Sequence, residues 1–332
     1  MAGEPDRAFW RGKQVTVTGG AGFLGNAVVR DLDALGAETR VIRSSEHDLR
    51  VPEAARDAVE GAEVVIHLAA RVGGIGFNRR NPAPLVYDNL MMGTNVFEQS
   101  RLAGVSKLVA ACSVCAYPNL TPVPFKEDDL WIGYPEGSNA PYGLAKKMLL
   151  VLSDSYRRQY GFDSCAPVMA NLYGPGDNFD LEDSHVIAAM IRKFVEAEER
   201  GDDEVVLWGT GRPSREFLYV DDAARALILS AEQLDTSEPV NIGTGIGTSI
   251  RELGDMTKRL SGYGGKIVWD ASRPDGQPVR YLDVSRARDR LGFEANSRLE
   301  DGLRLTLESF RALKFSPASA GSPTALLAEK PA

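Results

Sequence analysis

The chain has little cysteine and little histidine: of its 332 residues, three are cysteine and three are histidine. The cysteines, Cys112, Cys115 and Cys165, are too few for the disulfide framework of a secreted protein, so a reducing compartment and a cytoplasmic location are expected. Cys112 and Cys115 form a C-x-x-C pair, but no second pair completes a zinc site. No metal is therefore predicted.

Long apolar runs and blocks of basic residues are also missing. No run approaches the roughly 18 apolar residues of a membrane-spanning helix, and residues 1–13 are polar rather than a signal-peptide core. Acidic residues outnumber basic ones by 46 to 38, which gives a formal net charge of −8. Neither a nucleic-acid partner nor a membrane partner is expected. The length and the 43% hydrophobic content allow a substantial core.

A glycine-rich turn near the N-terminus follows a β-rich run. Residues 13–18 read Lys-Gln-Val-Thr-Val-Thr, and residues 19–25 read Gly-Gly-Ala-Gly-Phe-Leu-Gly before an apolar helical stretch. A strand, a glycine turn and a helix in this order begin a Rossmann unit, because the glycines admit a pyrophosphate at the positive end of the helix. The spacing is G-x-x-G-x-x-G rather than the commoner G-x-G-x-x-G. The residues predicted to bind the cofactor here are Gly19, Gly22, Phe23, Leu24 and Gly25.

The ends of the next two predicted strands complete the expected cofactor site. The strand over about 38–42 ends at Arg43, where NAD-specific sites usually carry an acid; an arginine suits the 2′-phosphate of NADPH. A nearly continuous apolar run over residues 63–70 predicts a strand covered on both faces, with His67 as a core residue. The predicted cofactor contacts of these two ends are Arg43, Asp48, Leu49, Leu68, Ala69 and Ala70.

A serine, a tyrosine and a lysine form the predicted catalytic group. Tyr142 and Lys146 are four residues apart, so a helix places both on one face. An ammonium near a phenol favours the phenolate, and we expect Lys146 to lower the pKa of Tyr142 from its usual ~10. Ser113 ends another buried strand, at the edge where open α/β sheets bind ligands. This set suits proton-coupled reduction of a ketone, with Tyr142 and Lys146 also contacting the cofactor.

These motifs resemble the extended short-chain dehydrogenase/reductase superfamily of nucleotide-sugar enzymes, the NAD-dependent epimerases and dehydratases. More narrowly, the chain resembles the GDP-L-fucose synthases over roughly residues 11–312, through the strings at residues 72–75, 88–90, 171–179, 184–187 and 215–217. Members of that family are bifunctional epimerase/reductases acting on GDP-4-keto-6-deoxymannose. The resemblance implies NADPH-dependent reduction of a nucleotide-activated 4-keto-6-deoxyhexose with C3/C5 epimerisation, and a homodimer.

The resemblance also implies roles outside the reductase group. Cys115 and His185 match the family's epimerase pair. The implied substrate contacts are Asn171, Asn178, Lys193, Trp208, Arg215 and Asp275. Taken alone, Trp208 could equally be a core aromatic and Arg215 a member of a surface ion pair. Cys115 could be an inert small hydrophobe, and His185 could simply cap a helix.

Two departures from the family pattern leave alternatives open. Val114 and Ala170 stand where the family usually has hydroxyl-bearing residues, which removes two hydrogen-bonding groups near the sugar. One alternative is a dTDP-4-keto-6-deoxyhexose 4-ketoreductase without an epimerase step. Another is a nucleotide-sugar epimerase that retains NAD(P). A third is a binding or regulatory protein that keeps the fold without catalysis.

The predicted fold class is α/β, a Rossmann-type doubly wound parallel sheet with a smaller α/β substrate-binding lobe. A flexible N-terminus over residues 1–10 precedes a mainly NADP-binding domain over 11–175, which residues 215–245 complete. Residues 176–214 and 246–313 form the nucleotide-sugar lobe, and 316–332 a disordered tail. The superfamily implies that helices over about 83–103 and 142–160 form a four-helix dimer interface.

Overall fold

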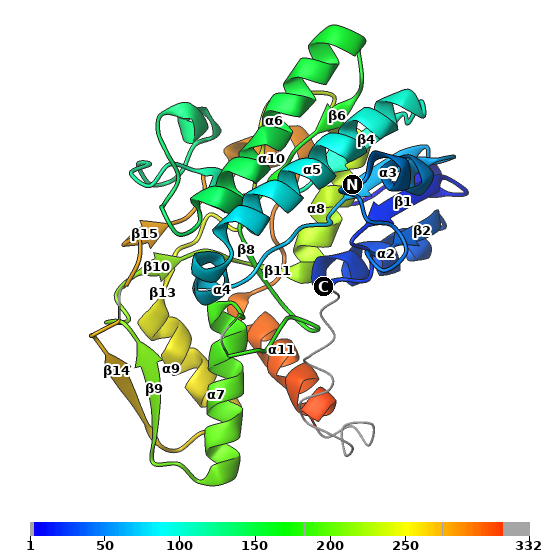
Figure 1. Cartoon of the computed structure of the whole chain (residues 1–332). Coiled ribbons are helices and arrows are strands. Elements are labelled where there is room, and N and C mark those ends of the chain that lie inside the picture. The colour runs from blue at the N-terminus through cyan, green and yellow to red at the C-terminus, as the bar shows by residue number, and fades with distance from the viewer. Residues whose placement is uncertain (1–2, 182, 274, 315–332) are drawn as a thin grey trace.

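Five parallel strands form the central sheet of the computed structural model, which describes residues 3–181, 183–273 and 275–314 (Figure 1). Their order is β2-β1-β3-β4-β6, so the strand order reverses beside β1. Ligands of open α/β sheets bind at such a reversal, outside the carboxyl ends of the strands. The strands are β1 (Gln14–Thr18), β2 (Glu38–Ile42), β3 (Val64–His67), β4 (Lys107–Ala110) and β6 (Ser164–Cys165).

Helices cover both faces of this sheet (Figure 1). On one face α3 (Pro52–Val59), α5 (Pro82–Leu102) and α6 (Ala140–Tyr160) pack side by side; on the other, α2 (Phe23–Leu35) packs against α8 (Val220–Gln233). Because both faces are covered, β3 and β4 are buried along their whole length, as their apolar sequences predict. The predicted Rossmann-type α/β class is confirmed.

The far half of the sheet is interrupted at Pro167, which has no N–H to donate to a neighbouring strand. Beyond this point three short parallel strands continue the sheet: β5 (Cys112–Ser113), β7 (Val168–Met169) and β12 (Asn241–Ile242). The pairing register is the same on both sides of the break, because Leu108 pairs with Ser164 before it and Cys112 pairs with Val168 after it. Next to them, β8 (Asn171–Tyr173) pairs with β11 (Phe217–Tyr219). The continuation carries Ser113 beyond the end of β4.

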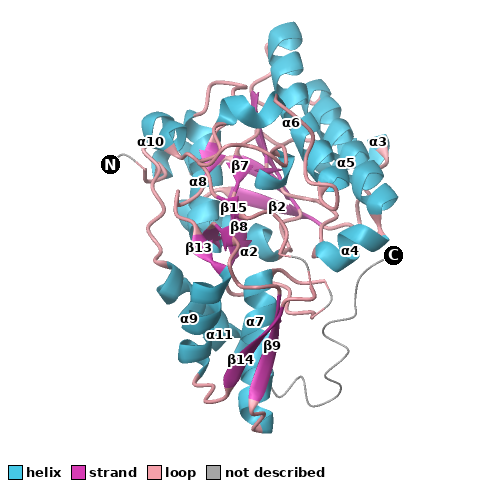
Figure 2. Cartoon of the chain, turned by 90° about the vertical axis from the view of Figure 1, so that its left-hand side faces the viewer, coloured by secondary structure: helices cyan, strands magenta, loops and turns pink. Residues whose placement is uncertain are grey.

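A smaller lobe extends below the sheet domain in Figures 1 and 2. It contains α7 (Val186–Arg200), α9 (Ile250–Ser261) and α11 (Leu299–Lys314), with a pair of strands, β9 (Glu204–Trp208) and β14 (Lys266–Asp270). A three-stranded sheet joins the two parts: β13 (Thr248–Ser249), β10 (Ser214–Arg215) and β15 (Val279–Arg280). The lobe has its own apolar core around Phe194 and Leu253. The strand predicted over residues 204–208 is confirmed.

Short elements complete the described chain. They are α1 (Arg7–Trp10), α4 (Ile75–Arg80), α10 (Ser285–Leu291) and two 3₁₀ turns, η1 (Val114–Ala116) and η2 (Glu127–Trp131). Within the described ranges, no helix combines the length and the apolar character that crossing a membrane requires.

Residues 3–10 lie within the segment predicted to be flexible, yet they contain a short helix and a buried side chain. Asp6 caps α1 by accepting from the N–H of Ala8, and the indole of Trp10 is fully buried. The Trp10 indole N–H donates to Glu232 on α8. Burial of one large aromatic side chain is enough to fix a short segment, so the prediction is wrong for residues 3–10. The predicted tail at 316–332 lies outside the described residues.

Candidate active site

The glycine turn connects β1 to α2 with very little room around its backbone. Gly19 has φ +69°, and a Cβ there would lie 2.8 Å from the backbone nitrogen of Ala69. A Cβ at Gly25 would lie 2.1 Å from the carbonyl oxygen of Gly19, so the helix packs directly on the turn. Gly22 is the N-cap of α2 and offers no side chain to the first turn of that helix. The first N–H groups of a helix have no acceptor within the helix, so a turn of this kind can accommodate an anion.

Arg43 lies exposed directly after β2, where the sequence predicts a contact with a 2′-phosphate. Asp48 is paired with Arg50, 2.7 Å between Oδ2 and Nη2, and this hydrogen bond lowers the pKa of Asp48. Leu49 is buried. Arg50, which the sequence analysis did not single out, also contacts Asp88 at 3.2 Å. On the neighbouring strand, half-buried residues follow β3 directly: Leu68, Ala69 and Ala70.

His67 is a core residue, as predicted. Its Nδ1 lies 2.7 Å from the Oγ1 of Thr18 on the adjacent strand β1. Burial, followed by the charge of Lys146, lowers the pKa of His67 to about 3. The imidazole is therefore neutral at physiological pH.

Ser113 and Tyr142 meet at the carboxyl end of β5. The Ser113 hydroxyl caps η1 by accepting from the N–H of Cys115 at 3.2 Å, and it interacts with the phenol of Tyr142, acting to lower the pKa of that phenol. Tyr142 lies in the first turn of α6. A Cβ at the next residue, Gly143, would lie 2.1 Å from the carbonyl oxygen of Cys115, so α6 approaches η1 closely enough to bring the two hydroxyls together.

Lys146 is 4% exposed and donates from Nζ to the carbonyl oxygen of Ala111 at 2.9 Å. Its Nζ lies 5.9 Å from the centroid of the Tyr142 ring, and burial lowers the pKa of Lys146 to about 8. The pKa of Tyr142 is raised by burial and then by Cys115 and Cys112, against the hydrogen bond from Ser113. The prediction that Lys146 lowers the pKa of Tyr142 is wrong, because desolvation of the phenol outweighs a cation held below its ring.

Cys115 lies half-buried in η1 and contacts a residue from the other end of the chain. Arg280 on β15 donates from Nη2 to the Cys115 sulfur at 3.6 Å. Arg280 is 8% exposed, and its strand pairs with β10 so that Arg215 is its neighbour. Arg280 was not predicted from the sequence, since a single arginine in a short β-rich run carries no local signal.

His185 is the N-cap residue of α7, but its side chain makes no capping hydrogen bond, which removes the interpretation of a simple helix cap. The imidazole is exposed, and the buried carboxylate of Asp177 interacts with it. Burial raises the pKa of Asp177 to about 6, while the interaction with His185 acts to lower it. Asp177 is a second residue that the sequence analysis missed.

Two hydrogen bonds tie the segment before His185 to the start of α6. The N–H of Gly74 donates to the carbonyl of Asp183 at 2.8 Å. Asn78, a few residues further on, donates to the side chain of Asn139 at 3.0 Å. Asn139 is the N-cap residue of α6, the helix that carries Tyr142. The chain around residues 74–78 therefore links the two ends of the site.

Trp208 is 62% exposed at the end of β9 and is not a core aromatic. Two cations lie over its ring, Lys193 at 5.7 Å and Arg273 at 5.1 Å from the centroid.

Arg215 is not a member of a surface ion pair: it donates to the carbonyls of Ser214 and Gln277 at 2.8 and 2.6 Å. Burial, followed by the charge of Arg280, lowers the pKa of Arg215 to about 10.

The other predicted substrate contacts make hydrogen bonds to other residues of the protein. Asn171 donates to the carbonyl of Glu216 at 2.9 Å, and Asn178 accepts from the N–H of Asp180 at 3.1 Å. Asp275 accepts from the N–H and the hydroxyl of Thr210 at 2.6 and 2.7 Å. Roles for these three in binding a substrate stay predictions.

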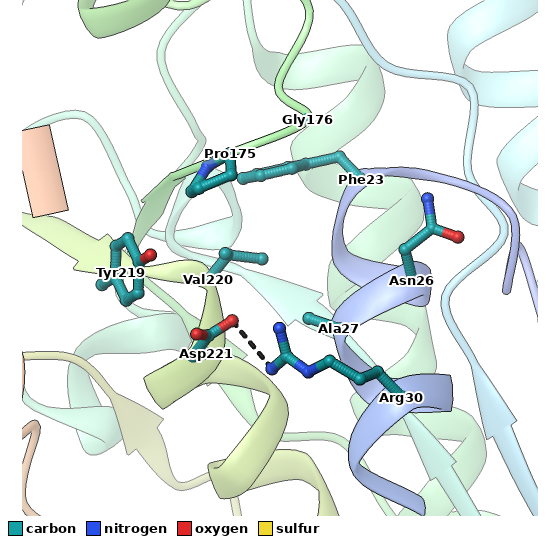
Figure 3. A pocket seen from close by; sticks show the side chains of 9 residues that line it. All are labelled: Phe23, Asn26, Ala27, Arg30, Pro175, Gly176, Tyr219, Val220 and Asp221. Atoms are coloured by element: carbon teal, nitrogen blue, oxygen red, sulfur yellow. Dashed lines mark hydrogen bonds and ion pairs between the residues drawn. The ribbon is translucent and has the colours of Figure 1, made fainter. Parts of the chain in front are cut away.

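A cavity of about 230 Å³ lies beside the glycine turn (Figure 3). Phe23 on α2 points toward Pro175 across it, and an ion pair of 2.9 Å joins Arg30 to Asp221 at the start of α8. Ser113, Tyr142 and Lys146 do not line this cavity. It therefore borders the predicted cofactor site at Phe23 without forming the predicted reaction site.

Comparison with known proteins places the chain in a family. The model of the NAD dependent epimerase/dehydratase family matches residues 15–243. The chain belongs to this family. The resemblance found in the sequence is thereby confirmed.

The matches to similar proteins extend over nearly the whole length of this chain and of each matched protein. GDP-L-fucose synthase of Escherichia coli K12 is 40% identical over 310 residues, which cover 90% of this chain and 96% of that protein. A Campylobacter jejuni GDP-6-OMe-4-keto-L-xylo-heptose reductase superposes with a TM-score of 0.86 at 29% identity, over 91% of this chain and 98% of that one. A Naegleria fowleri GDP-L-fucose synthetase bound to NADP superposes with a TM-score of 0.82 at 28% identity, over 92% and 96%.

Proposed function

We propose that this family member is an NADPH-dependent reductase of a nucleotide-activated 4-keto-6-deoxyhexose that also epimerises C3 and C5, as a GDP-L-fucose synthase does. One observation carries the proposal: Ser113 and Tyr142 meet, with Lys146 below, at the carboxyl edge of the sheet that also carries the glycine turn. The 40% identity to the E. coli GDP-L-fucose synthase supports the choice of substrate.

The residues at the glycine turn fit a dinucleotide. Because a Cβ at Gly19 or Gly25 would meet backbone atoms, the turn is built for glycine, and its N–H groups at the start of α2 would hold the pyrophosphate. Arg43, exposed after β2, would hold the 2′-phosphate that distinguishes NADPH from NADH. When bound, NADPH supplies the hydride.

Tyr142 would donate the proton that a reduced ketone oxygen requires. Its raised pKa keeps the phenol protonated at neutral pH, and the neighbouring Ser113 hydroxyl would donate to the same carbonyl oxygen. Lys146 would fix the start of α6 through the Ala111 carbonyl and contact the cofactor ribose.

Cys115 and His185 would move protons at C3 and C5, which the C4 ketone makes acidic. Removal of a proton by one group and its return to the opposite face by the other inverts a carbon centre. Cys115 adjoins Ser113 through η1, and the 74–78 segment links His185 to α6.

The nucleotide would bind along the smaller lobe. Trp208 presents an exposed ring on which a base can stack, with Lys193 beside it. Arg215 would pair with the pyrophosphate. We propose the same site for Asn171, Asn178 and Asp275, whose loops border it.

We also propose a homodimer formed through α5 and α6. These helices pack on one another and expose apolar side chains to solvent: Tyr87, Leu102, Met148, Val151 and Tyr160. Two copies of this pair would bury them in a four-helix contact. Sedimentation of the wild type and of Val151→Glu tests this, since the variant should sediment as a monomer. The cytoplasmic location stays a prediction.

A second candidate is a 4-ketoreductase without epimerisation. The superposition on a heptose reductase favours this candidate. So do two buried residues without hydroxyl groups: Val114, which follows Ser113, and Ala170, which precedes Asn171. The choice between the two candidates rests on whether protons at C3 and C5 exchange with solvent.

One incubation tests the proposal. The full chain is given NADPH and either GDP- or dTDP-4-keto-6-deoxyhexose in D₂O, and the products are resolved by NMR. We expect stoichiometric NADPH oxidation with the GDP sugar and deuterium at C3 and C5 of the product. Oxidation without deuterium there would establish the simple reductase. If neither sugar oxidises NADPH, the proposed function is wrong; interconversion without net oxidation would indicate an epimerase that retains its cofactor.

A further inference from the structure

Arg280 places a buried positive charge against a thiol. Its Nη2 lies 3.6 Å from the sulfur of Cys115, while its Nε is buried without a hydrogen-bond partner. Within the described ranges, no carboxylate lies within 4 Å of this guanidinium, unlike most of the arginines on the surface of the protein. Burying a charge without a paired anion is costly, so a negative charge close to Arg280 would be strongly stabilised.

The other groups around Cys115 do not offer that negative charge at neutral pH. Cys112 on β5 and Tyr142 on α6 interact with Cys115, and burial raises the pKa of Cys112 to about 11 and also raises that of Tyr142. Both are therefore neutral. Lys146 adds a further positive charge that interacts with Cys112.

Two more groups face Arg280 rather than the sulfur. Arg215, its neighbour on β10, is a cation and repels it. Glu136 is the acidic residue that interacts with Arg280: burial acts to raise the pKa of Glu136, but hydrogen bonds from Ser138 and Asn139, together with Arg280, outweigh it and lower that pKa. Glu136 is held by Ser138 and Asn139. The sulfur of Cys115 is thus the acidic group in direct contact with Arg280.

We propose that Arg280 is a positioning residue that holds Cys115 as a thiolate aimed at the substrate, so that Cys115 serves as the base of the epimerisation. The inference deepens the proposed function and rests on it. In the step, the thiolate takes a proton from the carbon next to the ketone: the C–H bond breaks, an S–H bond forms, and the electron pair moves to the carbonyl oxygen. His185 then supplies a proton to the opposite face of the same carbon: its N–H bond breaks, the electron pair returns from the oxygen to the carbon, and a new C–H bond forms.

The first test needs no substrate, so its outcome is independent of the proposed function. The rate at which iodoacetamide alkylates Cys115 is followed by peptide mass spectrometry from pH 5 to 10 on the full chain. A free thiol has a midpoint near ~8.5. We expect wild-type Cys115 to have a midpoint below that value, and Arg280→Met to move it up by about one unit or more, a tenfold slower reaction at pH 7.

Matched variants and internal controls separate this from a structural effect. Arg280→Lys, which keeps the charge, should restore most of the shift. Arg259→Met removes an exposed arginine paired with Glu300 in the smaller lobe and should leave the profile unchanged. Cys112 and Cys165, both buried, should stay unreactive in the folded protein.

The proposal is overturned if wild-type Cys115 titrates at or above the value of a free thiol, or if Arg280→Met leaves the midpoint in place. Should Arg280→Met not fold, the wild-type profile and Arg280→Lys decide the matter. With substrate, deuterium exchange at the epimerised carbon should fall about tenfold at pH 7 in Arg280→Met and recover as the pH rises, which a merely structural defect would not do. Absence of turnover in the wild type would refute the proposed function while leaving the alkylation result to stand.

Discussion

The Nζ atom of Lys146 lies 2.9 Å from the carbonyl oxygen of Ala111, at the point where the chain passes from β4 to β5. This bond holds the ammonium over the ring of Tyr142, 5.9 Å from its centroid. The phenol stays protonated because burial, and then Cys115 and Cys112, raise the pKa of Tyr142, while Ser113 acts to lower it.

Tyr142→Phe removes the proton donor and little else, since the ring stays in place. We expect turnover to fall by about 10²–10⁴-fold, the contribution typical of a general acid. The Kd for NADPH should change little. Stopped-flow measurement of NADPH oxidation, together with titration of cofactor binding, checks both. Turnover close to that of the wild type would remove Tyr142 from the reaction.

His67 makes the stability of the protein sensitive to acid. Its pKa is about 3 in the folded protein, against a value of about 6.5 for an exposed histidine, so between these values the unfolded chain binds a proton that the folded chain does not. The stabilisation is complete above about pH 6.5 and is lost as the pH falls toward 3, by up to about 1.4 kcal/mol per pH unit. Urea unfolding of wild type and His67→Gln from pH 7 to 4 should show a shallower decline in the variant. Parallel curves would contradict this.

Gly25→Ala tests the packing of α2 on the glycine turn. The added Cβ would lie 2.1 Å from the carbonyl oxygen of Gly19, and backbone cannot move aside as a flexible side chain can. We expect a loss of about 1–3 kcal/mol in unfolding free energy and weaker NADPH binding.

Gly137→Ala is the matched control for that variant. A Cβ at Gly137 meets nothing within 4 Å, so this substitution should change neither stability nor binding. Equal behaviour of the two alanine variants in thermal unfolding and cofactor titration would show that the contact at Gly25 does not matter.

Trp208→Ala tests the proposed nucleotide contact. Stacking of a base on an aromatic ring contributes about 1–3 kcal/mol, so the KM for the nucleotide sugar should rise about tenfold or more while kcat changes little. Trp131→Ala is the control, because Trp131 is also exposed, at 54%, and also has a lysine over its ring. A rise in KM of the same size in both variants would count against the assignment.

The sequence predicted those parts of the fold that local patterns encode. The glycine turn, the apolar runs of β3 and β4, and the long helices α5 and α6 were all predicted within a few residues. Each has a signature within one element: a turn that only glycine can make, a run covered on both faces, or a helical repeat.

The features that the sequence did not reveal depend on partners far away in the chain. The Trp10 indole bonds to Glu232, 222 residues further along the chain, and Cys115 contacts Arg280, 165 residues further along. The pKa of Tyr142 moved in the opposite direction from the prediction because a four-residue spacing shows that two groups are neighbours, but not how far each is removed from water.

The anchoring of the first residues affects how the protein can be produced. Gly3 has φ +82°, a Cβ there would lie 2.4 Å from the carbonyl oxygen of Gly292, and its own carbonyl accepts from Arg225 at 2.6 Å. An expression vector that rewrites position 3 as a cloning scar would push the start of the chain off α8 and expose the indole of Trp10. A cleavable tag is therefore best placed with its protease site ahead of this glycine.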